Sequence, residues 1–306
     1  VDPGRSSERA LHGLMVGRER DADYYHESRQ GSADERPVVF RIVGLTKAGA
    51  YDRVSLEVRA GEVLGIGGLA DSGKSELGRG AVGLVAPDAG AVQLGAEPPE
   101  APDIRTLIAR GVGYVPAERL AEGMIPLLPV AWNMSLASGA DLFSNRWGLW
   151  RGRHELKLSQ EYIRRLSIRA RGPTAPCSTL SGGNQQKVVL ARWLCRRPRV
   201  MILDNPTRGV DAGAKEELYR LVRDLSADGV GILLITDELL ELIGLSHRIA
   251  VMRAGRVTSI VPAPPHAKPT ERLLVALMLG DDPVAAAREP SPARHGPGAT
   301  AEQVRP

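Results

Sequence analysis

Residues 68–75 read Gly68-Leu69-Ala70-Asp71-Ser72-Gly73-Lys74-Ser75. This stretch fits the phosphate-loop pattern G-x-x-x-x-G-K-[ST] without a gap. It follows the apolar run Val63–Ile66 and precedes a helical pattern, which is the context that the motif requires. Glycines let backbone N–H groups converge on phosphate oxygens, and the start of a helix adds a partial positive charge. The stretch therefore predicts a nucleotide-binding loop between a buried strand and a helix.

Two side chains of this loop have expected roles in binding a nucleoside triphosphate. Lys74 is expected to reach the β- and γ-phosphates, and Ser75 to ligate Mg²⁺. A chance glycine-rich turn is the alternative, and the further motifs described below argue against it. The predicted nucleotide-binding residues are Gly68, Leu69, Ala70, Asp71, Ser72, Gly73, Lys74, Ser75 and Glu76.

Two further stretches accompany the phosphate loop. Val200–Asp204 is an apolar strand pattern that ends in a carboxylate, so Asp204 is either a capping residue or a second Mg²⁺ contact beside Ser75. Residues 180–187 read Leu-Ser-Gly-Gly-Asn-Gln-Gln-Lys. Ser181 is a good helix N-cap, and Gly182 and Gly183 permit close backbone approach, so this helix start suits an anion.

The three stretches together resemble the nucleotide-binding domain of ATP-binding cassette (ABC) transporters over about residues 37–280. Apart from Asn205, the pairing of Asn184–Lys187 with Asn205–Asp211 looks like the second nucleotide-binding domain of monosaccharide importers of the ribose, xylose and galactose type. The resemblance implies an α/β fold of the P-loop NTPase class, with an antiparallel β subdomain and an inserted helical subdomain. It also implies ATP and Mg²⁺ as ligands.

The stretch at residues 180–187 is called the signature below, and the resemblance assigns it to the nucleotide site of a neighbouring domain. In this family the signature contacts the γ-phosphate that a partner domain binds, in a head-to-tail sandwich. The residues concerned here are Leu180, Ser181, Gly182, Gly183, Asn184 and Gln185. Asp211 matches an aspartate in the loop that joins the two sites. It is equally a candidate cap for the predicted helix Ala214–Ser226, and both roles are compatible.

Three departures from the family pattern weaken the chain's own site. Asn205 stands where a glutamate normally polarises the attacking water, and an amide cannot take a proton. Asp237 replaces the switch histidine, and its carboxylate is expected to repel a γ-phosphate. Ala117 replaces a glutamine that senses Mg²⁺ and the membrane partner. We therefore expect nucleotide binding at Lys74 with slow hydrolysis, unless another group compensates.

Composition sets limits on the other classes of function. The 306 residues are 43% hydrophobic, enough for a sizeable core, and the net charge is only +4 with no basic run, which argues against a nucleic-acid partner. Cys177 and Cys195 are expected to be free thiols. No stretch reaches the roughly 18–20 apolar residues of a membrane helix. Any membrane-spanning partner must then be a separate segment or chain.

The pattern of apolar residues predicts three regions. Residues 37–282 form the α/β domain, with a helical subdomain at about 125–175. Residues 283–306 are expected to be disordered. Residues 1–36 are expected to be a linker and the tail of a preceding domain, because Glu8–Gly17 matches Glu271–Gly280 at six of ten positions. Two unrelated amphipathic helices are the alternative explanation of this match.

Individual elements are expected at particular ranges. The predicted strands are Val38–Val43, Ser55–Val58, Glu62–Gly67, Val112–Val115, Val200–Asp204, Gly231–Thr236 and Arg248–Met252. The predicted helices are Lys74–Leu84, Asn184–Cys195, Ala214–Ser226 and Thr270–Leu279. This alternation indicates a largely parallel sheet.

The sequence thus predicts an ATP-driven import subunit at the cytoplasmic face of the cell membrane. Its expected partners are a first nucleotide-binding domain, a transmembrane permease and, indirectly, an extracytoplasmic sugar-binding protein. A soluble cassette ATPase acting on DNA or ribosomes is one alternative. The roughly 105 residues between Ser75 and Ser181 leave no room for the long coiled coil of DNA-repair relatives. A non-catalytic nucleotide-sensing domain is the other alternative.

Overall fold

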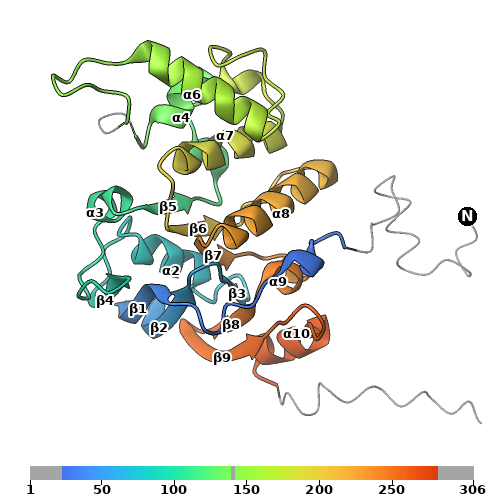
Figure 1. Cartoon of the computed structure of the whole chain (residues 1–306). Helices are drawn as coiled ribbons and strands as arrows, with labels where there is room; N and C mark the ends of the chain where they lie inside the picture. The colour runs from blue at the N-terminus through green and yellow to red at the C-terminus, as the bar shows by residue number, and fades with distance from the viewer. Residues whose placement is uncertain (1–22, 139–141, 282–306) are drawn as a thin grey trace, which may run out of the picture.

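The fold is described from a computed structural model that places residues 23–138 and 142–281 (Figure 1). The predictions for residues 1–22 and 283–306, including the repeat at Glu8–Gly17, lie outside the described residues. Within the described ranges, no helix has the length and apolar character needed to cross a membrane.

A six-stranded sheet forms the centre of the molecule. Its strand order is β5-β6-β7-β3-β8-β9, and all neighbours are parallel except β9, which pairs antiparallel with β8. The strands are β3 (Val63–Gly68), β5 (Val112–Val115), β6 (Val200–Asp204), β7 (Gly231–Ile235), β8 (Arg248–Arg253) and β9 (Arg256–Pro262). The expectation of a largely parallel sheet is therefore confirmed.

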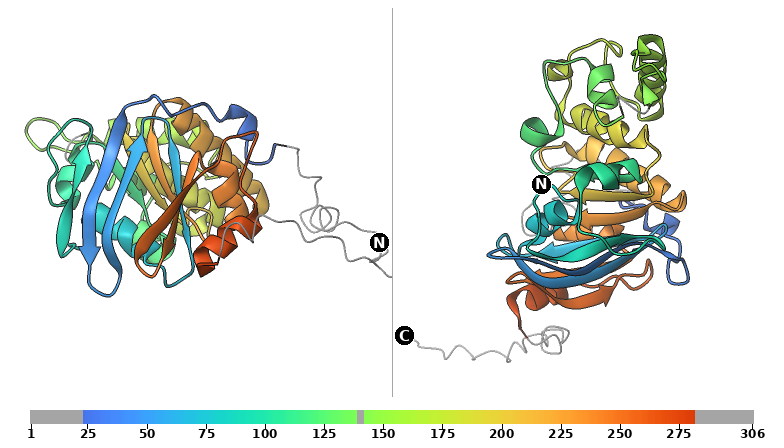
Figure 2. Two further views of the ribbon diagram at one scale, coloured as in Figure 1. Left: turned by 90° about the horizontal axis from the view of Figure 1, so that it is seen from below. Right: turned by 90° about the vertical axis from the view of Figure 1, so that its left-hand side faces the viewer.

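A second, three-stranded sheet is antiparallel, with the order β2-β1-β4. Its strands are β1 (Val38–Lys47), β2 (Tyr51–Arg59) and β4 (Ala89–Leu94), and Figure 2 shows the blue strands of this sheet alongside the larger one. One core cluster joins the two sheets, with Phe40 and Ile42 from the small sheet and Ile202 and Ile235 from the large one. This sheet is the antiparallel β subdomain expected from the resemblance.

Helices cover the central sheet through separate apolar clusters. Helix α2 (Lys74–Ala81) contributes Leu77 to the cluster that also contains both sheets. Helices α7 (Gly182–Leu194) and α8 (Ala212–Ala227) contribute to a second cluster with residues of β6 and β7. Helices α9 (Leu239–Leu245) and α10 (Glu271–Leu279) pack with β8 in a third.

The described residues between 125 and 175 lie at the end of the molecule farthest from the small sheet (Figure 1). They include α4 (Val130–Ser135) and α6 (Gly152–Arg165). The short elements that complete the fold are α3 (Ile104–Ala109), η1 (Glu27–Arg29), η2 (Arg119–Gly123) and η3 (Cys177–Thr179).

The segment that precedes β1 packs onto the domain over its described part. Tyr24 and Tyr25 form edge-to-face and tilted ring contacts with Tyr219 of α8. A Cβ on Gly244 of α9 would lie 2.2 Å from the ring of Tyr25, so the glycine permits this close approach. Residues 23–36, hereafter the N-terminal segment, thus contact α8 and α9, whereas the sequence predicted a linker and the tail of a preceding domain over residues 1–36.

The structure changes several predicted elements. The ranges of β5 and β6 are as predicted, but α2 ends at Ala81 rather than Leu84, because Gly83 adopts a left-handed φ of 74°. The strands β4 and β9 and the helices α3 and α9 were not predicted. Cys177 and Cys195 are buried free thiols, as expected.

Candidate nucleotide-binding site

The strand order brings the motifs together at one edge of the central sheet. Strand β7 lies between β6 and β3, so the carboxyl ends of these three parallel strands are neighbours. The phosphate loop follows β3, Asn205 follows β6 and Asp237 lies just beyond β7. Ligands of open α/β sheets bind at this edge, outside the carboxyl ends of the strands.

Two glycines of the phosphate loop are required by close backbone contacts. Gly73 has φ = 84°, and a Cβ at this position would lie 2.1 Å from the carbonyl oxygen of Ala50. A Cβ on Gly68 would lie 2.5 Å from the carbonyl oxygen of Met252. The loop therefore fits against the small sheet and β8 only with glycine at both positions, and α2 begins directly after it at Lys74.

A cavity of about 580 Å³ lies over the phosphate loop, a volume within the usual range for small-molecule sites. Of the predicted nucleotide-binding residues, Ala70, Lys74, Ser75 and Glu76 line it. The rest of the lining comes from the small sheet, from the loops after β5, β6 and β7, and from α2, namely Lys47, Ala48, Gly49, Ala50, Tyr51, Arg79, Val85, Ala117, Glu118, Glu122, Asp204, Asn205, Arg208 and Asp237.

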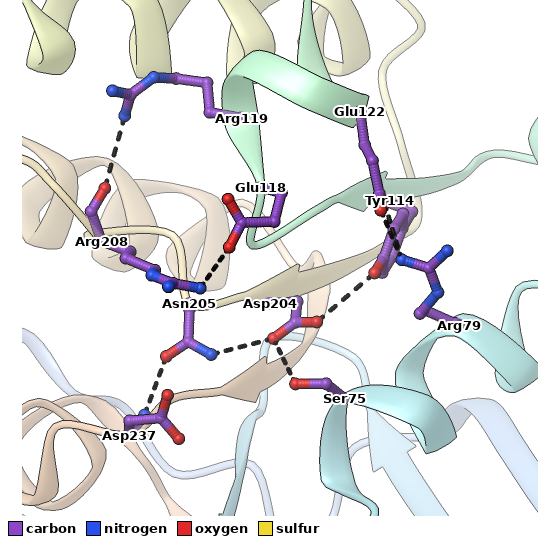
Figure 3. A network of polar contacts seen from close by, with 10 residues as sticks. All are labelled: Ser75, Arg79, Tyr114, Glu118, Arg119, Glu122, Asp204, Asn205, Arg208 and Asp237. Carbon is purple, nitrogen blue, oxygen red and sulfur yellow. Dashed lines mark hydrogen bonds and ion pairs between the residues drawn. The ribbon is translucent and has the colours of Figure 1, made fainter. Parts of the chain in front are cut away.

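The two predicted Mg²⁺ ligands are adjacent in this cavity. The hydroxyl of Ser75 donates to Oδ1 of Asp204 at 3.0 Å, and the hydroxyl of Tyr114 lies 3.5 Å from Oδ2 (Figure 3). Burial raises the pKa of Asp204 to about 6. Mg²⁺ is commonly held by one or two protein oxygens together with substrate phosphates, and this pair of oxygens fits that requirement.

The side-chain amide of Asn205 forms two hydrogen bonds within the protein. Its Nδ2 donates to Oδ1 of Asp204 at 3.2 Å, and its Oδ1 accepts the backbone N–H of Asp237 at 2.9 Å (Figure 3). The residue has φ = 44°, a left-handed conformation that asparagine tolerates better than most residues. The amide therefore ties β6 to the loop after β7, a role that the sequence did not indicate.

Lys74 is buried and engages Asp237. Its Nζ lies 2.9 Å from Oδ1 of Asp237 and 3.0 Å from the carbonyl oxygen of Leu69. The lysine side chain is 3% exposed, whereas that of Asp237 is 62% exposed. The sequence anticipated only repulsion between Asp237 and a γ-phosphate, and this ion pair with the phosphate-loop lysine was not foreseen.

The loop after β5 supplies charged residues that the sequence analysis did not assign. Glu118, adjacent to Ala117, pairs with Arg208 at 2.5 Å. Glu122 pairs with Arg79 of α2 at 2.8 Å (Figure 3). The charges next to Ala117 in the sequence indicated that ion pairs could form here. Their partners could not be identified from the sequence, because they lie far away along the chain.

The signature lies outside this cavity, since no residue of Leu180–Gln185 is among those that line it. Ser181 is at the N-cap position of α7, but its hydroxyl accepts from Nδ2 of Asn184 at 2.8 Å and caps no helix N–H, contrary to our expectation. The glycines serve packing: a Cβ on Gly182 would lie 2.8 Å from the carbonyl oxygen of Gly209, and one on Gly183 2.4 Å from Cβ of Ala214.

Two further residues lie close to the predicted motifs. Asp211 is the N-cap of α8, and its carboxylate accepts from the N–H of Ala214 at 3.0 Å, as its capping role required. Tyr51 is only 2% exposed and belongs to the core cluster between the sheets, and it also lines the cavity.

Comparison with known proteins decides the family. The family model described as ABC transporter matches residues 51–208, which is more than half of the chain. The chain belongs to the ABC transporter family. Its fold is that of an ATP-binding cassette. A nucleotide-free ATP-binding cassette from an ABC transporter superposes with a TM-score of 0.63 at 20% identity, covering 81% of this chain and 97% of that one. A dimeric cassette in a post-hydrolysis state with ADP and Pi gives 0.62 at 25% identity, covering 73% and 98%.

The curated relatives are more similar in sequence. A ribose import ATP-binding protein of Rubrobacter xylanophilus is 41% identical over 263 residues, which are 86% of this chain and 51% of that protein. An arabinose import ATP-binding protein of Burkholderia cenocepacia is 39% identical over 267 residues, 87% and 51% of the two chains. A putative ribose/galactose/methyl galactoside import ATP-binding protein of Burkholderia ambifaria is 40% identical over 249 residues, 81% and 47%. The cassette therefore spans about half the length of these relatives.

Proposed function

We propose that this chain is the ATP-binding subunit of an ABC importer for a monosaccharide or a similar small polar solute. It couples ATP binding and hydrolysis to transport. The observation that carries the proposal is the cavity where Lys74, Ser75 and Asp204 meet at the end of the central sheet. The import function is carried over from the relatives, whose names specify ribose, galactose and arabinose import.

The residues at the centre of the cavity have defined tasks in this proposal. Lys74 and the phosphate loop, Gly68–Ser75 with Glu76, hold the nucleotide phosphates. Ser75 and Asp204 hold Mg²⁺, which neutralises phosphate charge when it is bound. Asn205 supplies no general base, because an amide cannot take a proton, and its side chain is hydrogen-bonded to Asp204 and to the backbone of Asp237. The site on Lys74 is therefore impaired in hydrolysis and contributes mainly to closure of the assembly.

The signature acts on a second site in a partner nucleotide-binding domain, in the same or a separate chain. Support for this arrangement comes from its position outside the cavity at Lys74 and from the exposure of Ser181. Ser181, Gly182 and Gly183 contact the γ-phosphate bound by the partner, and Asp211 lies in the loop between the two sites. Hydrolysis then occurs mainly at the partner's site, and the pair is asymmetric.

Transport requires partners in the membrane. A transmembrane permease would carry the solute, and an extracytoplasmic sugar-binding protein would deliver it, while the cassette is held peripherally at the cytoplasmic face. The end of the cassette that contains α4 and α6 is the proposed permease contact. It carries exposed apolar side chains at Trp132, Leu136 and Leu156, which are 52%, 49% and 40% exposed, around a groove of about 750 Å³.

The soluble alternatives receive less support. A DNA- or ribosome-acting ATPase has no counterpart among the relatives described above, which are named as import proteins. A purely sensing domain would not need the signature, which places the exposed Ser181 at the start of α7. The proposal is therefore that ATP is hydrolysed by the pair formed by this chain and its partner nucleotide-binding domain.

Replacing Ser181 tests the assignment of the signature to the partner's site. In the complete pair, Ser181→Arg is expected to reduce steady-state ATP hydrolysis to the background level, because a long cation fills the space meant for the γ-phosphate. Binding of ATP by this chain alone should stay unchanged, since Ser181 does not line its cavity. Phosphate release by the pair and equilibrium nucleotide binding by the chain measure the two effects.

Thr179→Arg, also an exposed position just before the signature, is the matched control and should leave hydrolysis by the pair within about twofold of the unmodified value. The isolated chain should hydrolyse ATP slowly and the pair faster. Rapid turnover by the isolated chain, or full activity of the Ser181→Arg pair, would contradict the proposal.

A further inference from the structure

The contact between Asp237 and Lys74 places a carboxylate where a nucleotide phosphate would bind. Nζ of Lys74 is 2.9 Å from Oδ1 of Asp237, and the lysine is buried below the cavity that both residues line. Asp237 is a mostly exposed residue whose carboxylate can move, whereas the ammonium of Lys74 is held inside. The carboxylate of Asp237 therefore competes with any anionic ligand for the ammonium group of Lys74.

The donors of Lys74 can be counted. An ammonium group has three N–H donors. Among the described residues, one donor is directed at the carbonyl oxygen of Leu69 at 3.0 Å and a second at Asp237. One donor remains for a phosphate oxygen. A diphosphate needs one contact to its terminal phosphate, but a triphosphate engages this lysine through both its β- and γ-phosphates.

The backbone of Asp237 is fixed in this position. Its N–H donates to Oδ1 of Asn205 at 2.9 Å, and the side-chain amide of Asn205 also bonds Asp204. Because β6 and β7 are paired along their length up to Asp204 and Ile235, the loop that carries Asp237 is anchored at the strand ends. The carboxylate is thus presented to Lys74 by the fold.

Among the described residues, none of the other carboxylates of the cavity forms an ion pair with Lys74. Glu118 is neutralised by Arg208 and Glu122 by Arg79. Asp204 accepts from Ser75 and Asn205. Glu76, in the first turn of α2, has no ion pair with Lys74 among the described residues. Asp237 is therefore the carboxylate that a γ-phosphate has to displace.

We infer that the site on Lys74 prefers a nucleoside diphosphate to the triphosphate, with the carboxylate of Asp237 occupying the place of the γ-phosphate on the lysine. The inference rests on the proposed function, because it assumes that this cavity binds nucleotides. It assigns Asp237 as the residue that determines the choice between di- and triphosphate.

The test compares the affinities of the full chain for ADP and ATP, each with Mg²⁺, by isothermal titration calorimetry. The unmodified chain should bind ADP at least as tightly as ATP. Asp237→Ala should tighten ATP binding about tenfold or more relative to ADP, since a charge-assisted contact to Lys74 is removed. Asp237→Asn should shift the ratio in the same direction but less, because its amide oxygen can still accept from Lys74. Thermal unfolding of each variant verifies that it is folded.

Glu97→Gln is the matched control, because it removes a carboxylate that pairs with Arg110 and does not line the cavity. Both affinities should be unchanged in this variant. If Asp237→Ala leaves the ADP-to-ATP ratio unaltered while both nucleotides bind, the inference is overturned and the proposed function stands. If neither nucleotide binds to the unmodified chain, and Lys74→Ala makes no difference, the proposed nucleotide site is itself overturned.

Discussion

Asn205→Glu is expected to raise single-turnover hydrolysis at the Lys74 site by about 10²-fold, because a positioned general base typically contributes at least this much. Asn205 lines the cavity next to Asp204, so a longer side chain with a carboxylate can reach an attacking water there. The water's oxygen attacks the γ-phosphorus, its proton passes to the new carboxylate, and the bond to the β-phosphate oxygen breaks. ADP and phosphate are the products.

The measurement uses the complete pair with the partner's own phosphate-loop lysine replaced, so that only the Lys74 site turns over. Excess enzyme is mixed with radiolabelled ATP and phosphate release is followed in time. Asn205→Gln is the matched control, because glutamine has the length of glutamate but no basic carboxylate. It should give no acceleration. An equal gain in both variants would mean that side-chain length, and not proton acceptance, limits the reaction.

The same substitution should lower stability slightly. Glutamate must adopt the left-handed φ of 44° that Asn205 has, and it loses the donor to Asp204. A cost of roughly 1 kcal/mol is expected for the backbone conformation. If Asn205→Glu folds normally and hydrolysis does not increase, Asp237 or Ala117 sets the limit instead.

Local patterns in the sequence predicted much of the fold that holds this site. Val112–Val115 and Val200–Asp204 are short and buried throughout, so their apolar runs have clear ends. Strand β9 was missed because its residues alternate between half-buried and exposed and include Arg256, Thr258 and Ser259. Such a polar edge strand is defined by its antiparallel pairing with β8, and this pairing is a tertiary contact.

The polar contacts of the site were less predictable than its residues. The sequence identified Lys74, Asp204, Asn205 and Asp237 individually. It could not predict that Asp237 would pair with Lys74, because that contact depends on β7 lying beside β3 in the sheet. It also assigned Ser181 as a capping residue, whereas the hydroxyl oxygen of Ser181 accepts from the side-chain amide of Asn184. The N-cap preference of serine is an average over many helices, and a hydrogen bond to a nearby side chain can replace the capping bond in a particular helix.

Arg223→Met is expected to destabilise the domain by about 3 kcal/mol, because this arginine holds the N-terminal segment on the domain. Arg223 is 1% exposed. Its guanidinium donates to the carbonyl oxygens of Tyr25 at 3.1 Å, Leu245 at 2.9 Å and Gly244 at 2.5 Å, and to Oε1 of Gln30 at 3.2 Å. Methionine keeps part of the apolar stem but removes the guanidinium donor from the carbonyl oxygens of Tyr25 and Leu245, whereas Gln30 and Gly244 still accept from Lys268. Each such acceptor costs roughly 1–3 kcal/mol.

Equilibrium unfolding in urea measures this change, and the midpoint of thermal unfolding should fall by about 6–12 °C. Arg220→Met, one turn earlier on the same helix, is the matched control. Arg220 is exposed and pairs only weakly with Glu216 at 3.5 Å, so its loss should cost less than about 0.5 kcal/mol. Equal stability of the two variants would show that the buried arginine does not anchor the N-terminal segment.

The pH dependence of stability provides a second test of the role of Arg223. Burial, and then the nearby charge of Arg223, lower the pKa of Lys268 to about 8, below its value in the unfolded chain. Between pH 8 and about 10.4 the unfolded state binds the proton of this lysine and the folded state does not, so the contribution of Lys268 to stability rises with pH across this window. The buried thiols of Cys177 and Cys195 act in the opposite direction, because burial raises their pKa to about 11 and about 12. Lys268 shares Gln30 and Gly244 with Arg223 as acceptors. Removing the guanidinium charge should raise the pKa of Lys268 and reduce its rising contribution to the pH profile, whereas Arg220→Met should preserve it, because burial and charge at Lys268 are unchanged.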